Sequence, residues 1–321
     1  MSGRFKYSLF FLVLIAASVW LAVFSYPAPK LNIIACNVGQ GDAFLVQYKS
    51  TQILVDGGPG KSVLDCLSKY MPFWDRRIEV VILTHPQKDH YMGLVGVFQN
   101  YKVENFIATP LDASAQEWGV LKSLVGSKGV NVINPNSDMV MRLGLIHLDI
   151  LWPSSAFLAS EGKPPNENRA ILSGSASDSA LRRVSLYRNG VLGTLTSKKD
   201  PNEFSILAIL SYKDFNALFT GDIGGPQIDQ IISSGKVRDV DYLKVPHHGS
   251  KNGLTSKLLE ASTPEVAVIS AGKNNSYGHP HKEVLDILNS FKIKTVRTDD
   301  KGDIELITDG ETWFIKSSRD K

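Results

Sequence analysis

Six of the seven histidines in the chain lie in short polar segments that each follow an apolar, strand-like run. The first run, residues 80–84, leads into His85, Asp89 and His90. Imidazole nitrogens and carboxylate oxygens are donors that borderline divalent metals accept, and neutral imidazole binds without adding charge. This segment therefore predicts a metal site, and a solvated polar loop is the alternative when the segment is taken alone.

Three later segments repeat the arrangement of an apolar run followed by histidine or aspartate. They are residues 217–220 before Asp222, residues 242–245 before His247 and His248, and residues 266–270 before His279 and His281. Binding and catalytic side chains of α/β folds gather at the carboxyl ends of strands. We therefore expect the four segments to converge, and we interpret His147, inside a strand-like alternation, as structural.

The bulk properties restrict the class of protein only loosely. A chain of 321 residues can form one large domain or two ordinary ones, and a net charge of +3 is too small to indicate nucleic-acid binding. Two cysteines make neither a disulfide framework nor a thiolate metal site. We expect Cys36 and Cys66 to be buried free thiols, with a bridge between them as the alternative.

The amino-terminal residues predict a membrane segment. Arg4 and Lys6 precede an uncharged run over residues 7–26, which is about the 20 residues that span a bilayer. We interpret residues 1–30 as an uncleaved anchor and a short linker. Because basic residues precede the span, the domain is expected outside the cytoplasm. A cleaved signal peptide, which would give a secreted protein, is the alternative.

The pattern of the remaining residues, 31–321, predicts a single mixed α/β domain. Strands are expected at residues 31–36, 43–48, 51–55, 80–84, 105–109, within 140–151, and at 206–211, 217–220, 242–245, 266–270, 294–297, 304–308 and 312–315. Helices are expected at residues 62–70, 92–100, 113–127, 226–233, 256–261 and 282–291. Residues 154–201 break the pattern and predict an irregular insertion with a hairpin at 185–195. A layered sandwich fits this order better than separate domains.

Several ordered motifs resemble those of a known family. The run from His85 to His90, then Asp222, then His247 to Ser250 resembles the metallo-β-lactamase superfamily. Residues 38–42, 56–58, 220–222, 244–250 and 278–280 look more narrowly like the hydrolase domain of the ComEC family of DNA-uptake proteins. The similarity covers residues 31–315 apart from the insertion. The multi-span channel portion of that family has no counterpart among these residues.

The resemblance implies a four-layer αββα sandwich with metal at one edge of the two sheets. It assigns one metal to Asp89, His90, Asp222 and His248, and a second to His85, with Asp222 bridging. His247 would contact substrate or support a ligand, although the two neighbouring histidines could exchange roles. The metal would be zinc or manganese.

The second metal position is expected to be weak because its ligands depart from the family pattern. Gln87 stands where the superfamily has a histidine, and Asn202 and Ser205 lie in the region of another missing histidine. An amide is a poorer donor to a transition metal than imidazole or carboxylate. We therefore expect one firmly bound ion and one loosely bound ion.

The resemblance also implies roles for the remaining polar residues. Asp222 would position the attacking water, Asp89 would accept its proton, and His279 would protonate the leaving oxygen, bind a phosphate or support a ligand. Asp42 and Asp56 are expected to orient ligands or to cap turns, with direct coordination of the metal as the alternative. Ser250 and Lys251 are candidates for the substrate side, and a solvated lysine is the alternative for the second of these.

The function that follows is an exported, metal-dependent phosphodiesterase or nuclease of the competence type. Arg182, Arg183, Lys198 and Lys199 could guide a DNA backbone, or form only a solvated face. The alternatives are a hydrolase of another envelope ester, such as a phosphocholine ester or a lactone, and a non-catalytic binding module with a decayed metal site. Expected partners are nucleic acid, the membrane and a channel protein; the oligomeric state stays open.

Overall fold

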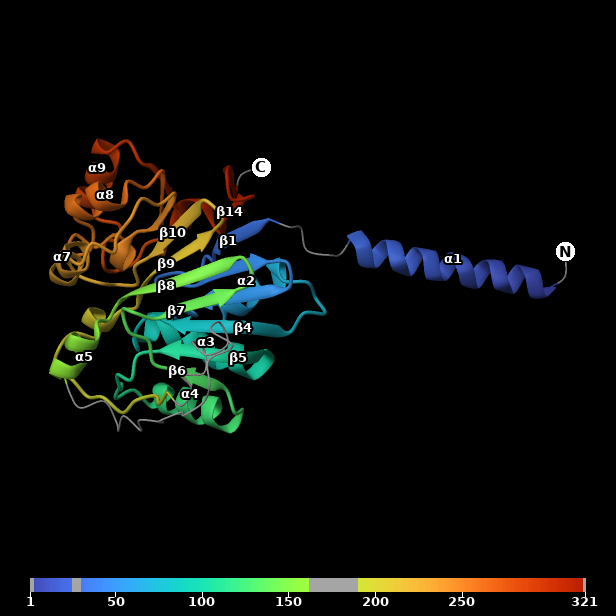
Figure 1. Cartoon of the computed structure of the whole chain (residues 1–321), viewed down its shortest axis with the longest axis horizontal. Helices are drawn as coiled ribbons and strands as arrows, with labels where there is room; N and C mark the ends of the chain where they lie inside the picture. The colour runs from blue at the N-terminus through green and yellow to red at the C-terminus, as the bar shows by residue number, and fades with distance from the viewer. Residues whose placement is uncertain (1–2, 25–29, 162–189, 320–321) are drawn as a thin grey trace, which may run out of the picture.

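The computed structural model describes residues 3–24, 30–161 and 190–319, and its globular part is built from two mixed sheets (Figure 1). The first sheet has the order β15-β14-β1-β2-β3-β4-β5-β6. Its strands are β1 (Leu31–Ala35), β2 (Phe44–Tyr48), β3 (Thr51–Val55), β4 (Arg77–Leu83), β5 (Lys102–Ala108), β6 (Asn131–Ile133), β14 (Ile304–Thr308) and β15 (Trp313–Ser317).

The second sheet has the order β13-β12-β11-β10-β9-β8-β7. Its strands are β7 (Val140–Leu143), β8 (Ile146–Trp152), β9 (Leu207–Tyr212), β10 (Phe215–Phe219), β11 (Tyr242–Lys244), β12 (Val266–Ile269) and β13 (Lys294–Arg297). Strands β10 to β13 run parallel. Their carboxyl ends therefore lie at one edge of this sheet.

Apolar side chains fill three layers. The middle layer lies between the sheets and joins Ile33 and Val80 of the first sheet to Leu148 and Ala217 of the second. Two outer layers bury the other face of each sheet under helices. The helices on the first sheet are α2 (Ser62–Tyr70), α3 (Lys88–Asn100) and α4 (Gln116–Ser127), and those on the second are α7 (Gly225–Ser233), α8 (Ser256–Ser262) and α9 (Lys282–Ser290). The αββα sandwich is thus confirmed.

Most elements lie within a few residues of their expected positions, with informative exceptions. Strand β6 and the short helix α10 (Thr298–Lys301) were not predicted. Helix α3 begins at Lys88, so Asp89 and His90 lie on its first turn instead of in a loop. His147 lies within β8, as expected.

The predicted insertion is only partly described. Helix α5 (Ser155–Glu161) opens it, and residues 162–189 lie outside the described residues, including part of the predicted hairpin. The described end, residues 190–195, makes no strand; it makes an isolated parallel bridge between Leu195 and Leu111. This bridge joins the segment to the loop before α4.

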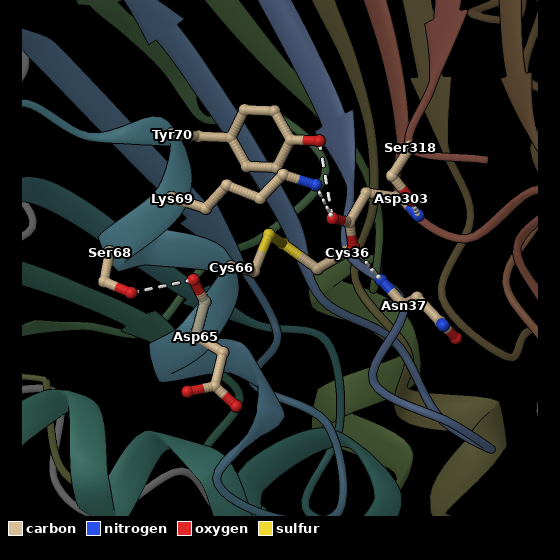
Figure 2. Close-up of a disulfide and its surroundings, with 9 residues drawn as sticks. All are labelled: Cys36, Asn37, Asp65, Cys66, Ser68, Lys69, Tyr70, Asp303 and Ser318. Atoms are coloured by element: carbon tan, nitrogen blue, oxygen red, sulfur yellow. Dashed lines mark hydrogen bonds and ion pairs between the residues drawn. A yellow bond between two sulfur atoms is a disulfide. The ribbon is translucent and has the colours of Figure 1, made fainter. Parts of the chain in front are cut away.

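The expectation of free thiols is wrong, because Cys36 and Cys66 form a disulfide (Figure 2). The bond links the end of β1 to α2, and both cysteines are buried. Their sequence separation of 30 residues gave no indication of contact. Disulfides persist mainly in oxidising compartments, so this bond is typical of a domain outside the cytoplasm.

Replacing both cysteines with serine is expected to destabilise the domain. Closing a loop of 30 residues lowers the entropy of the unfolded chain, which corresponds to about 3–4 kcal/mol. The measurement is the free energy of unfolding of the full chain in detergent. Reduction of the wild type with dithiothreitol is the control, since it should lower stability by a similar amount. Equal stability of oxidised and reduced wild type would contradict the prediction.

The amino terminus forms one isolated apolar helix, α1 (Gly3–Phe24). Its 22 residues correspond to roughly 33 Å of helix, which matches the thickness of the hydrocarbon core of a bilayer. Among the described residues it is the one helix long and apolar enough to span a membrane. The side chains from Tyr7 to Phe24 are not buried by the rest of the chain. A signal sequence and an anchor both have these properties.

Candidate metal centre

Histidines and aspartates from both sheets meet at the edge formed by the carboxyl ends of the strands. Strand β4 leads into His85 and the first turn of α3, and β10 leads into Asp222. Strand β11 leads into η2 (Pro246–Gly249), a short helical turn that contains His247 and His248. Apolar strands thus bring polar loops from distant parts of the sequence to one point.

Four residues form a compact group whose ligand atoms all lie within 4.8 Å of one another: Asp89, His90, Asp222 and His248. Asp222 Oδ2 lies 3.0 Å from His248 Nε2 and 3.3 Å from His90 Nε2. Asp89 Oδ2 lies 3.5 Å from His248 Nε2. All but Asp89 are buried, and Asp89 is about one third exposed. These are the four residues to which the family resemblance assigns the first metal.

Hydrogen bonds at Nδ1 hold the His90 and His248 rings so that Nε2 of each ring points into this group. His90 Nδ1 donates to Asp56 Oδ2 at 2.9 Å, and Asp56 in turn accepts from both the backbone N–H and the hydroxyl of Thr84. His248 Nδ1 donates to the carbonyl of Ser270 at 3.0 Å. Such partners fix the tautomer and the ring orientation of metal-binding histidines.

The backbone around these side chains is strained. His247 and His248 both have left-handed conformations, with φ of 50° and 53°, and Asp56 has φ of 60°. Residues other than glycine adopt this region at an energetic cost and mostly at functional sites. Gly221 is also left-handed, and a Cβ there would lie 2.9 Å from Ser205 Cβ. Glycine thus allows the turn that places Asp222.

Attraction between opposite charges dominates the electrostatics of the group. Burial by itself would lower the pKa of His90 and of His248, but neighbouring carboxylates, above all Asp222, raise both pKa values well above the ordinary value. Burial would likewise raise the pKa of Asp222, yet the charges of His248, His90 and Lys244 hold that pKa well below its usual range. The imidazoles and carboxylates of the group therefore stabilise one another's charged forms.

Lys244 is a member of this centre that the sequence reading did not single out. Its side chain is buried, and its ammonium contacts the Asp42 carboxylate, Asp222 Oδ1 at 3.2 Å and the Gly221 carbonyl at 2.6 Å. Burial would lower the pKa of Lys244, but Asp42 and Asp222 raise it. The position of Lys244 inside the otherwise apolar strand β11 could have indicated its role, because a buried lysine needs a buried partner of opposite charge.

Asp42, Asp56 and His90 form a second compact group of potential ligands. Lys244 already contacts Asp42, and Asp42 Oδ1 lies 3.2 Å from His248 Nδ1. Because an ammonium already neutralises Asp42, this group is a poorer candidate for an ion than the first group. The structure instead places Asp42 and Asp56 behind the two central imidazoles.

His85 lies beside the four-residue group but is not part of it. Its ring centroid is 4.1 Å from that of His90, and its Nε2 faces Gln87 Oε1 at 3.2 Å. Burial and the charge of His90 lower its pKa to about 3, so it is neutral at physiological pH. Neutral imidazole is the form that binds metal.

Ser205 lies in the region where the family resemblance implies a further histidine. Its hydroxyl is 3.2 Å from His85 Nδ1 and accepts a hydrogen bond from the backbone N–H of Asp222 at 3.1 Å. Asn202 lies on the turn η1 (Pro201–Phe204), and its buried side-chain oxygen has no hydrogen-bond partner among the described residues. The polar partners of the two His85 ring nitrogens are therefore the hydroxyls of Thr84 and Ser205 and the amide oxygen of Gln87.

Two more histidines border the group on its open side. His247 Nε2 is 3.9 Å from Asp222 Oδ2, and the side chain is 29% exposed. The His279 ring lies 5.7 Å from that of His247, and burial together with nearby histidines lowers its pKa to about 4. His281 is the N-cap of α9.

Several predicted substrate-side residues are not brought into contact with the centre in the described part of the chain. Ser250 is buried, and its hydroxyl accepts from the backbone of Asn252. The Lys251 side chain is exposed. Lys199 pairs with Glu161 and Glu203, which fits a solvated face better than a DNA guide. Arg182 and Arg183 lie outside the described residues.

The four-residue group fits a divalent metal ion. Among the described residues, His90 Nε2 and His248 Nε2 are buried without a hydrogen-bond partner, and both point toward carboxylates. Two imidazoles and two carboxylates are a donor set that zinc and manganese accept. A buried nitrogen left unpaired is unfavourable, and coordination would satisfy it.

The fold and this site define a superfamily. The sequence model of the metallo-beta-lactamase superfamily matches residues 36–273, so the chain belongs to that superfamily. ComE operon protein 3 of Bacillus subtilis is 22% identical over 317 residues, which cover 91% of this chain and 35% of that protein. Recombination protein 2 of Haemophilus influenzae is 28% identical over 120 residues, covering 37% of this chain and 15% of that protein.

Competence protein ComA of Neisseria gonorrhoeae is 33% identical over 90 residues, covering 28% of this chain and 13% of that protein. The chain is thus a distant homologue of competence proteins and spans about a third of the length of the Bacillus relative. Among solved structures, the metallo-beta-lactamase fold protein YhfI of Bacillus subtilis is 10% identical. The match covers 89% of this chain and all of that one, with a TM-score of 0.49.

Proposed function

We propose that the protein is a metal-dependent phosphodiesterase that acts on nucleic acid outside the cytoplasmic membrane. The observation that carries the proposal is the group of Asp89, His90, Asp222 and His248, whose ligand atoms lie within 4.8 Å of one another. Its open side is bordered by His247 and His279. The homology to competence proteins favours a DNA substrate over other esters.

The four residues would hold one zinc or manganese ion, and His85 would hold a weaker second ion. A divalent ion supplies an acidified water and neutralises the oxygens of a phosphodiester. Asp89, the most exposed member of the group, would accept the proton of the attacking water, while Asp222 would orient that water. His247 and His279 would hydrogen-bond the phosphate and the leaving oxygen.

The test is hydrolysis by the full chain in detergent, with zinc, manganese and magnesium supplied in turn. The substrates are single-stranded DNA, double-stranded DNA, a small phosphodiester, a phosphocholine ester and a lactone. Cleavage of DNA and of the small phosphodiester, lost in His90→Ala, supports the proposal. Cleavage of only the phosphocholine ester or the lactone would indicate a different envelope hydrolase. A purified protein that binds none of the supplied metals and cleaves none of the substrates would indicate a binding module. Either result overturns the proposal.

We infer further that α1 is retained as an anchor and that the domain faces the membrane with the edge opposite the metal centre. Strand β1 is antiparallel to β2, β2 is antiparallel to β3, and β3 is parallel to β4. The amino ends of β1 and β4 therefore share one edge, and the centre lies past the other end of β4. The seven residues of β4 separate the two edges by roughly 20 Å.

The anchor edge carries side chains suited to a membrane interface. Phe73 and Trp74, in the loop before β4, are 81% and 54% exposed and pack edge to face at 4.7 Å. Lys30 and Lys49 are both exposed. They lie at the same edge of the sheet because their chain neighbours Leu31 and Tyr48 are paired between β1 and β2. Aromatic rings collect at the membrane interface, and lysines are attracted to anionic headgroups.

A fluorophore at position 74 is expected to contact lipid in the full chain reconstituted in nanodiscs. Trp74→Cys labelled with an environment-sensitive dye should show blue-shifted emission and quenching by brominated lipid. Tyr277→Cys, labelled in the same way at the opposite edge, is the matched control and should remain in water. Equal quenching at both positions would exclude this orientation, and a native protein that lacks residues 1–24 by mass spectrometry would exclude the anchor.

A further inference from the structure

A polar cavity of about 610 Å³ opens beside the metal centre, and His279 belongs to both. Its wall is formed by the loop between β12 and α9 and by the region around α10. The charged residues of the wall are three cations and two carboxylates: Lys273, Arg297, Arg319, Asp299 and Asp300. The cations exceed the carboxylates, so the cavity suits an anionic ligand.

Among the described residues, the cations of the wall that form no ion pair with a carboxylate are Lys273 and Arg319. Arg297 is already paired with Asp299, through Nε at 3.0 Å and Nη2 at 2.5 Å. Arg319 donates from Nη1 to the carbonyls of Asp299 and Asp300, at 3.0 and 2.9 Å. A guanidinium has five N–H donors, so these contacts fix the side chain while its other nitrogens remain able to bind an anion.

An aromatic series leads from the metal centre through His279, which lines the cavity, to Tyr277, the chain neighbour of Gly278 in the cavity wall. The His279 ring is stacked on that of Tyr277, with centroids 5.6 Å apart and 24° between planes, and is also near parallel to that of His248 at 6.3 Å. Tyr277 is 65% exposed. A large exposed ring held beside a catalytic centre is a surface on which a planar group can stack.

The loop that carries Tyr277 is held in one conformation by Asn275. The Asn275 amide donates to the carbonyls of Gly272 and His279, at 2.8 and 2.6 Å. Its side-chain oxygen accepts from the backbone N–H groups of Tyr277 and His279, at 3.1 and 3.0 Å. The stack is thus ordered before a ligand arrives, which lowers the entropic cost of binding.

We propose, on the basis of the phosphodiesterase function above, that this cavity binds the nucleotide next to the scissile bond of a single strand. Its base stacks on Tyr277, and its phosphate faces Lys273 and Arg319. Stacking requires an unpaired base, so the site selects single strands over duplexes. The excess of cations disfavours a choline headgroup, although aromatic rings also attract quaternary ammonium ions.

The test compares wild type with Tyr277→Ala as full chains in detergent, using fluorescence anisotropy with labelled oligothymidylate in the presence of a chelator. Loss of one stacked base should weaken binding roughly tenfold. Tyr277→Trp should restore affinity, and Phe291→Ala is the control, since Phe291 is a partly exposed aromatic residue at the far end of α9. An oligonucleotide abasic at every position should bind wild type and Tyr277→Ala equally.

A second measurement separates the phosphate contacts from stacking. The double variant Lys273→Ala and Arg319→Ala should reduce the slope of log affinity against log salt by about 1 to 2. An unchanged affinity of Tyr277→Ala for oligothymidylate would overturn the stacking site even if the protein cleaves phosphodiesters. If Tyr277→Ala binds oligothymidylate tenfold more weakly but the wild type hydrolyses no phosphodiester, the stacking site is supported and the proposed function is rejected.

Discussion

Replacing Asp222 with asparagine is expected to reduce phosphodiester hydrolysis by on the order of 10³-fold, the scale of losing a preorganised charge at a reaction centre. Asp222 Oδ2 is close to both central imidazoles, at 3.0 and 3.3 Å, and Oδ1 faces Lys244 at 3.2 Å. Asparagine preserves the shape but removes the charge that balances these three groups. The cost is large because the residue is buried, where charges are poorly screened.

Metal content provides a second readout for this variant. The wild type should retain an ion after dialysis, whereas Asp222→Asn should retain much less, as measured by mass spectrometry of the metal. Asp149→Asn is the matched control, because Asp149 pairs with Arg238 at a partly exposed position away from the centre. Full activity and full metal content in Asp222→Asn would show that this carboxylate is not a ligand.

Replacing Lys244 with methionine is expected to lower the free energy of unfolding by about 3–5 kcal/mol, the range for breaking a buried ion pair from one side. Methionine fits the apolar strand β11, so little packing is lost. Asp42 loses its cation, and Asp222 Oδ1 loses its partner at 3.2 Å. Both carboxylates are buried, and removing the ammonium that neutralises a buried carboxylate is unfavourable.

Denaturant unfolding of the metal-free full chain in detergent measures this effect. Combining Lys244→Met with Asp42→Asn should recover part of the lost stability, because the second change removes one unpaired charge. Lys236→Met is the control; its partner Asp138 is 76% exposed, and loss of such a surface pair costs about 1 kcal/mol or less. If Lys244→Met lowers the free energy of unfolding by only about 1 kcal/mol or less, as expected for a surface pair, the buried lysine does not have the proposed structural role.

The sequence by itself determined the elements that carry the centre. Apolar runs with β-branched residues predicted β4, β10, β11 and β12, and a histidine or aspartate follows each run. These signals are local, because strand formation and burial depend on residues adjacent in the chain. The apolar helix α1 was predicted for the same reason, since its length and composition are properties of one continuous segment.

Only the tertiary structure decided which side chains meet. The pairing of Cys36 with Cys66, of Asp56 with His90 and of Lys244 with Asp42 joins residues at least 30 positions apart. Each pair depends on how a helix packs on a sheet, how two loops cross or how two sheets face one another. Local periodicity contains no information on such contacts, so the expectation of free thiols at Cys36 and Cys66 was wrong and the buried Lys244 was missed.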